Sequence, residues 1–190
     1  MRYKIGVFGS TEDFDKSLVV KVKEIGKLLG QKKVIIITGA TSGFPYITSY
    51  EAFKNGAEIW GYSYEQNLKN IKKRMPDHDL SIYTRLTYIP TSFPFASDIQ
   101  VCKKYRNVIS TANCDAGIII AGRFRTLNEF TNLYDMGKII GVLTNTGGVA
   151  NELPKLCKKI SKKNKAKVIF SDNPSELIKN IIAELYLKNL

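Results

Sequence analysis

The sequence predicts an α/β protein built on one doubly wound parallel sheet with helices on both faces. Short apolar runs alternate along all 190 residues with segments in which apolar residues recur at helical spacing. The runs at residues 34–37 and 117–120 are continuous and rich in isoleucine, which is typical of parallel strands covered on both faces. Because alternating strands and helices favour a parallel sheet, we predict a single domain over residues 1–190, without linker or internal repeat.

Seven strands are expected, each a short run of apolar or β-branched residues. They cover residues 3–8, 34–37, 57–62, 86–89, 117–120, 139–143 and 167–170. Residues 63–81 are polar and charged, and we predict that they form a connection between two strands.

Helices are expected where apolar residues recur every three or four positions. They cover residues 16–29, 45–54, 97–113 and 127–136, and a last helix begins at Asp172 or Asn173. Gly30 and Gly137 are typical residues to end the first and fourth of these helices. Pro174 fits the first turn of the last one.

The formal net charge of +12 raises nucleic acid as a partner. The lysines, however, concentrate in residues 69–74 and 155–167 with few aromatic residues between them, so we interpret these stretches as solvated helical faces. No apolar stretch approaches the roughly 18–20 residues that span a bilayer. Residues 1–8 are too short and polar for a signal peptide. We therefore expect a cytoplasmic protein without a membrane partner, and we regard nucleic acid as an unlikely ligand.

Cys102, Cys114 and Cys157 are odd in number and lack C-x-x-C spacing, which predicts free thiols, with Cys114 buried beside a strand. The single histidine, His78, lies in a polar run, where we expect a solvated side chain. The parts of a zinc site and of a histidine-based triad are therefore missing, and we predict neither metal nor cofactor.

Four predicted strands run directly into loops rich in glycine and hydroxyl residues: residues 9–11, 39–43, 122–126 and 144–148. In a parallel sheet these loops emerge at the carboxyl edge, where such folds bind ligands. Glycine lets a backbone approach a phosphate, and a helix N-terminus supplies N–H groups with partial positive charge. We therefore expect a phosphorylated small molecule there. The expected binding residues are Gly9, Ser10, Thr11, Gly39, Thr41, Ser42, Gly43, Gly122, Arg123, Arg125 and Thr126.

Neither G-x-G-x-x-G nor G-x-x-x-x-G-K-[ST] occurs, which disfavours the standard dinucleotide and triphosphate sites. A more specific pattern begins at Arg106, continues through the strand at 117–120 and ends in Thr126-Leu127-Asn128-Glu129. It resembles the lysine decarboxylase-like family of Rossmann-fold proteins, which includes the Lonely Guy phosphoribohydrolases. That family carries an arginine before a strand and then P-G-G-x-G-T-x-x-E at the start of a helix. The resemblance extends over roughly residues 3–150.

The resemblance implies a Rossmann-like fold, a homodimer and a nucleotide as ligand. It also implies an activity, the hydrolysis of the N-glycosidic bond of a nucleoside 5′-monophosphate to free base and ribose 5-phosphate. By this resemblance, Arg106 and Glu129 occupy the catalytic positions. Glu129 would activate water and stabilise a ribosyl cation, and Arg106 would hold phosphate or sugar oxygens.

Arg123 and Arg125 stand where the family motif has glycine. Glycine commonly serves where φ is positive or where a ligand lies against the backbone. Either the loop therefore follows a different path, or the two arginines bind additional negative charge themselves. Arginine side chains that fill the pocket favour a protein that binds a nucleotide without cleaving it, and side chains in solvent favour the hydrolase. A third hypothesis, nucleic-acid binding through the +12 charge, predicts steep salt dependence.

Overall fold

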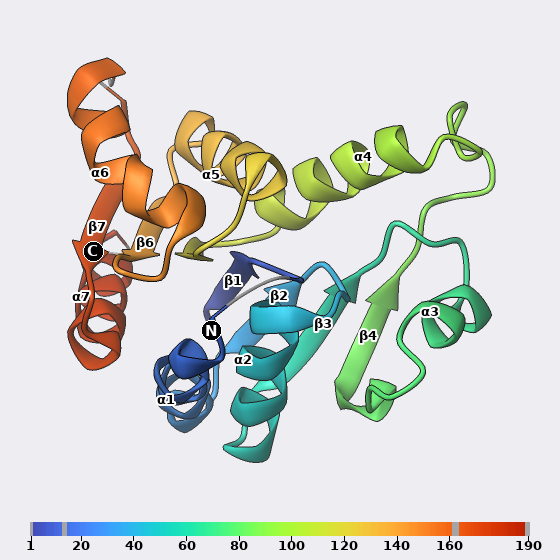
Figure 1. The fold of residues 1–190 in the computed structure, drawn as a ribbon, viewed down its shortest axis with the longest axis horizontal. Coiled ribbons are helices and arrows are strands. Elements are labelled where there is room, and N and C mark those ends of the chain that lie inside the picture. The colour runs from blue at the N-terminus through green and yellow to red at the C-terminus, as the bar shows by residue number, and fades with distance from the viewer. Residues whose placement is uncertain (1, 13–14, 161–163, 189–190) are drawn as a thin grey trace.

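Seven parallel strands form one sheet in the computed structural model, which describes residues 2–12, 15–160 and 164–188 (Figure 1). The strands are β1 (Lys4–Gly9), β2 (Ile35–Thr38), β3 (Glu58–Tyr62), β4 (Tyr83–Thr87), β5 (Ala116–Ile120), β6 (Ile139–Leu143) and β7 (Lys167–Ser171). Their order across the sheet is β4-β3-β2-β1-β5-β6-β7, and every neighbouring pair is parallel. The predicted parallel sheet is confirmed.

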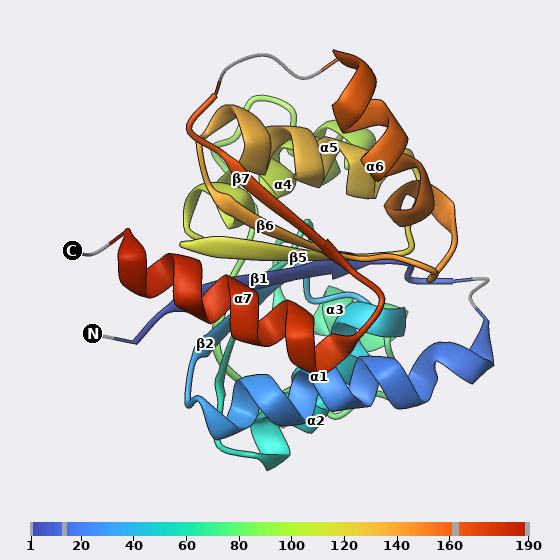
Figure 2. The same ribbon diagram turned by 90° about the vertical axis from the view of Figure 1, so that its left-hand side faces the viewer.

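Helices cover both faces of this sheet. They are α1 (Val19–Gln31), α2 (Gly43–Lys54), α3 (Leu68–Arg74), α4 (Ile99–Ala112), α5 (Phe124–Asp135), α6 (Gly148–Ile160) and α7 (Pro174–Leu187), with the 3-10 turns η1 (Lys16–Leu18) and η2 (Leu80–Ile82). Figure 2 shows α1, α2 and α7 on one face and α4, α5 and α6 on the other. The doubly wound arrangement is therefore confirmed as well.

The alternation of side chains along β5 explains why this strand is apolar at every position. Ile118 and Ile120 pack into the cluster that contains residues of α1, α2 and α7. Ile119 points to the other face and packs with residues of α5 and α6. All three side chains are fully buried. Because successive residues of a strand face opposite sides, a strand between two helical layers needs an apolar residue at each position.

The strand order creates an opening at the centre of the carboxyl edge. The chain forms β1 to β4 on one side and then crosses back to β5, which pairs with the other side of β1. The helix after β1 and the helix after β5 lie on opposite faces, so the loops leaving these strands diverge. Ligands bind at such a switch point in open α/β sheets.

The polar segment at residues 63–81 is more regular than predicted, since it contains α3 and most of η2. Asn67 caps α3 by accepting a hydrogen bond from the Asn70 N–H group at 3.0 Å. Ile71 alone is buried in this short helix, so the sequence offers no apolar periodicity there. Two other predicted starts were three residues late: β4 begins at Tyr83, and α5 begins at Phe124 within a polar, arginine-rich turn.

The cysteines are free thiols and Cys114 is buried, as predicted. His78 differs from the expectation of a solvated residue, because its ring packs edge-on against Tyr46 with 4.3 Å between the ring centroids. Burial lowers the pKa of His78. Of the lysine-rich stretch, α6 contains the part up to Ile160, whereas residues 161–163 lie outside the described residues. No helix formed by the described residues has both the length and the apolar composition to cross a membrane.

Candidate functional site

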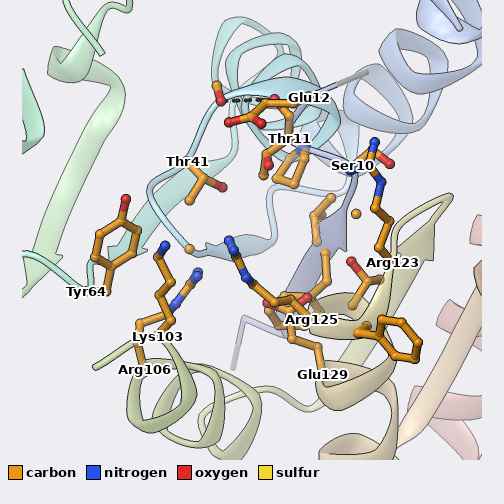
Figure 3. A pocket seen from close by; sticks show the side chains of 18 of the residues that line it. Ser10, Thr11, Glu12, Thr41, Tyr64, Lys103, Arg106, Arg123, Arg125 and Glu129 are labelled. Carbon is orange, nitrogen blue, oxygen red and sulfur yellow. Dashed lines mark hydrogen bonds between the residues drawn. The ribbon is translucent and has the colours of Figure 1, made fainter. Parts of the chain in front are cut away.

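A cavity of about 470 Å³ lies at the carboxyl edge of the sheet, where β1, β2 and β5 end (Figure 3). Its walls come from the loops after these strands and after β3, and from α2, α3, α4 and α5. The lining residues are Val7, Phe8, Gly9, Ser10, Thr11, Glu12, Gly39, Thr41, Ser42, Pro45, Tyr64, Arg74, Lys103, Arg106, Arg123, Phe124, Arg125, Thr126 and Glu129. The cavity lies within the size range of small-molecule sites.

Ser10 connects the loops that surround the cavity. Its N–H group donates to the Ile120 carbonyl at 3.2 Å, and its own carbonyl accepts from the Phe44 N–H group at 2.9 Å. Its Oγ accepts from the Gly122 N–H group at 3.0 Å. Gly43 has a φ of +73° and packs so closely on the Ser10 backbone that a side chain would not fit. The first loop is thereby fixed to those after β2 and β5.

The first turn of α5 offers donors for an anion. Gly122 turns the chain into this helix with a φ of +92°. Arg123, the N-cap residue, is extended with a φ of −126°, and no side chain caps the turn. The first-turn N–H groups of Phe124, Arg125 and Thr126 lie beyond the reach of intrahelical acceptors and face the carboxyl edge. The two arginines that replace glycines cause no backbone strain, since neither needs a positive φ.

The loop of residues 144–148 supports the cavity from behind. Thr146 Oγ1 accepts a hydrogen bond from the Ala121 N–H group at 2.9 Å. Gly148 has a φ of +55° and lies against the backbone of Gly122. We expected this loop at the ligand edge with the other three, but no residue of it lines the cavity. Its role is to hold the loop after β5 in place.

Arg106 comes from α4 and lies across Gly39, where a Cβ atom would overlap the guanidinium group. The glycine therefore makes room for an arginine, and it also lines the cavity in which we predicted a phosphate. Arg106 is 7% exposed, and no described group accepts a hydrogen bond from its buried Nε. Figure 3 shows its guanidinium directed into the cavity. Burial lowers the pKa of Arg106 although the negative charge of Glu129 raises it, so the described residues compensate this buried cation only in part.

Glu129 lies on the second turn of α5 and is 6% exposed. Burial raises the pKa of its carboxyl group to about 7, although the positive charges of Arg106, Arg125 and Lys104 lower it. Near neutral pH the protonated and ionised forms therefore coexist, so this group is able to accept or donate a proton.

A basic wall lies opposite the first turn of α5 and was not predicted (Figure 3). Arg74 from α3 and Lys103 from α4 stack on the Tyr64 ring, 4.6 and 4.9 Å from its centroid. Arg74 is anchored, because its Nη2 donates to the Ala40 carbonyl at 2.9 Å and its Nε lies 3.4 Å from Glu65 Oε1. The segment predicted as a polar connection with a solvated helical face thus supplies one side of the site through α3.

The structure brings most of the predicted site residues to one cavity: Gly9, Ser10, Thr11, Gly39, Thr41, Ser42, Arg106, Arg123, Arg125, Thr126 and Glu129. Gly43 and Gly122 do not line it and instead shape the loops behind it. Sequence reasoning missed Glu12, Tyr64, Arg74, Lys103 and the pocket position of Phe124. For Lys103 a signal existed, because it precedes Arg106 by one helical turn and so shares its face.

The fold and the cavity define a Rossmann-like protein with a cavity at the carboxyl edge of a parallel sheet. Residues 2–178 match the model of the SLOG cluster4 family, and the chain belongs to that family. The resemblance to Lonely Guy-type proteins is thereby confirmed at the level of the family. No curated protein shows significant similarity to the chain.

Several solved structures share the fold. TM1055, a structural-genomics target, aligns with a TM-score of 0.75 and 17% identity over 96% of this chain and 99% of that one. The molybdenum cofactor carrier protein of Chlamydomonas reinhardtii aligns with a TM-score of 0.68 and 14% identity over 98% of this chain and 99% of that one. DNA processing protein A of Helicobacter pylori, which binds single-stranded DNA, aligns with a TM-score of 0.69 and 16% identity over 96% of this chain and 81% of that one. At these identities the similarity shows the fold alone.

Proposed function

We propose that this protein binds a phosphorylated, nucleotide-like small molecule in the cavity at the carboxyl edge. The excess of positive charge among the lining residues carries the proposal. The cations are Arg74, Lys103, Arg106, Arg123 and Arg125, whereas the acidic residues are Glu12 and Glu129. Guanidinium groups match phosphate oxygens in a bidentate manner, and the first turn of α5 adds backbone donors.

The positions of the two substituted arginines favour binding over catalysis. Arg123 and Arg125 both line the cavity. They therefore take up volume and add positive charge in the same cavity as Glu129, the residue that would perform the hydrolysis. Phe124 lies between them in the sequence, lines the cavity and is 87% exposed. A ring at the mouth of the cavity suits a planar base, which would stack on it.

The proposal is tested by comparing AMP, GMP, CMP, UMP and IMP with the corresponding nucleosides in thermal-shift and calorimetric titrations. We expect the nucleotides to raise Tm and the nucleosides to leave it unchanged. Arg125→Ala should weaken nucleotide binding about tenfold or more, since it removes a charge-assisted contact. Arg85→Ala is the matched control, because Arg85 stacks on Trp60 outside the cavity. Equal stabilisation by nucleosides, or equal losses in both variants, would refute the proposal.

A phosphoribohydrolase is the second candidate, and the buried Glu129 beside Arg106 supports it. A carboxyl group with a pKa of about 7 is suited to activate water at an N-glycosidic bond. Chromatography of the same five nucleotides after incubation with the protein tests it, with Glu129→Ala as the control. Release of base that disappears in this variant would establish the hydrolase. Binding without release would leave the protein as a carrier or sensor of the nucleotide.

A further inference from the structure

The cavity has positive groups on two opposite sides. In Figure 3, Arg123 and Ser10 lie on one side, near the first turn of α5, and Lys103 and Tyr64 lie on the other. Arg125 lies between the two sides. One phosphate group held by the first turn of α5 would therefore leave the far side without an anion.

On the side of the cavity formed by Lys103 and Tyr64, the positive charges are only partly balanced by carboxylates of the described residues. Arg106 is more than nine-tenths buried, and its Nε has no acceptor among the described residues. Burial and the positive charges of Arg125, Arg74 and Arg106 lower the pKa of Lys103. Arg74 has Glu65 as an ion-pair partner at 3.4 Å. The negative charges of Glu129 and Glu65 raise the pKa of Arg106 and of Lys103 respectively, but burial and the neighbouring cations outweigh them and lower both values. An anion between the two side chains would therefore relieve their mutual repulsion.

The stacking on Tyr64 holds this cluster in place. Arg74 and Lys103 both lie within 5 Å of its ring centroid, at 4.6 and 4.9 Å, and come from different helices. Lys103 and Arg106 are one turn apart on α4 and both line the cavity. Two cations stacked on one aromatic ring, together with a buried guanidinium one helical turn from Lys103 whose Nε has no acceptor among the described residues, form a built site and not a scatter of surface charges.

We propose that the cavity has two anion subsites, one at the first turn of α5 and a second formed by Lys103 and Arg106 beside Tyr64. The ligand is then a nucleotide-like molecule with two phosphate groups, such as a nucleoside diphosphate, a nucleoside bisphosphate or a dinucleotide. This inference rests on the proposed binding function and names the ligand class of the same cavity.

The test measures dissociation constants by calorimetry at fixed ionic strength for AMP, ADP, adenosine 3′,5′-bisphosphate and NAD. At least one ligand with two phosphates should bind about tenfold or more tightly than AMP, the contribution expected of one charge-assisted phosphate contact. Lys103→Ala should abolish this advantage, because it weakens the binding of the doubly phosphorylated ligands more than the binding of AMP. Thr126→Val, on the other side of the cavity, should weaken AMP and the doubly phosphorylated ligands alike.

Lys104→Ala is the matched control, because Lys104 follows Lys103 on α4 but does not line the cavity. It removes the same charge and should preserve the advantage of the second phosphate. Equal affinity for AMP and all three larger ligands would overturn the second subsite and leave the proposed function intact. The same holds if Lys103→Ala and Lys104→Ala have equal effects. Failure of all four nucleotides to bind would instead refute the proposed function itself.

Discussion

Gly39 and Arg106 are adjacent in space although 67 positions separate them, and each restricts the other. The glycine leaves the volume in which the guanidinium lies, and the guanidinium supplies the buried positive charge of the cavity. The glycine that we interpreted as a site of close approach to a phosphate therefore also has a packing role.

Gly39→Ala should displace the Arg106 side chain and so weaken nucleotide binding about tenfold or more, while the free energy of unfolding falls by roughly 1 kcal/mol because the displaced group is the end of a flexible side chain. Calorimetric titration and chemical denaturation measure the two effects. In an Arg106→Ala background the overlap is absent, and Gly39→Ala should then cost no stability. An equal cost in both backgrounds would contradict the packing explanation.

Glu129 should make stability depend on pH. Its carboxyl group ionises near pH 7 in the folded chain but near 4.5 when unfolded. Because the folded state holds the proton more tightly, this contribution is complete below about pH 4.5 and is lost as the pH rises through 7. The free energy of unfolding of Glu129→Gln, relative to that of the parent protein, should therefore rise by about 2–3 kcal/mol between pH 4 and pH 8.5. Denaturation at both pH values measures it. Glu152→Gln, at an exposed position on α6, should show no such gain.

At the scale of the elements, the central strands were predictable because they lie between two helical layers, as the burial of Ile118, Ile119 and Ile120 in β5 shows. The four glycine-rich loops were predictable as well, because each directly follows a strand that the sequence predicts. The lysines of α3 were interpreted as a solvated helical face, but the bounds of this helix were not predictable, because its stability comes from a cap at Asn67 and one buried residue, Ile71. The basic wall around Tyr64 was not predicted, because the sequence did not indicate that Arg74 of α3 faces the cavity.

Two neighbouring glycines in the loop of residues 144–148 allow a test of whether this loop holds the backbone of Gly122 in place. Gly147 and Gly148 both have positive φ, but a Cβ atom at Gly147 would meet nothing, whereas one at Gly148 would overlap the Gly122 backbone. Gly147→Ala should cost roughly 1 kcal/mol from backbone strain alone. Gly148→Ala should cost roughly 2–4 kcal/mol and also weaken nucleotide binding, because Gly122 must move. Thermal denaturation and titration measure both, and equal effects would contradict the supporting role.

At the scale of the whole molecule, the net charge of +12 and the similarity in fold to a DNA-binding protein make nucleic acid the main competing ligand. Three of the lysines, Lys155, Lys158 and Lys159, lie on α6, which does not line the cavity. Charge spread over an outer helix attracts phosphates without selecting a sequence. The homodimer and the cytoplasmic location that we expected also remain predictions at this scale.

Binding of a 20-nucleotide single strand, followed by fluorescence anisotropy, should therefore be weak and should decrease steeply between about 50 and 200 mM salt. Binding of a mononucleotide in the cavity should decrease less over the same range, because fewer phosphate contacts are involved. Tight binding of the oligonucleotide at 200 mM salt, displaced by AMP, would contradict this expectation and place a nucleic acid in the cavity.

The hydrogen bond from the Gly122 N–H group to Ser10 Oγ joins loops that belong to opposite halves of the sheet. Those loops are thus organised before any ligand arrives, and binding has little backbone left to order. A preorganised site loses less conformational entropy on association, so affinity reflects the contacts themselves. Hydrogen exchange in the two loops should then be slow in the free protein and change little on binding, as in a rigid receptor and unlike a closing lid.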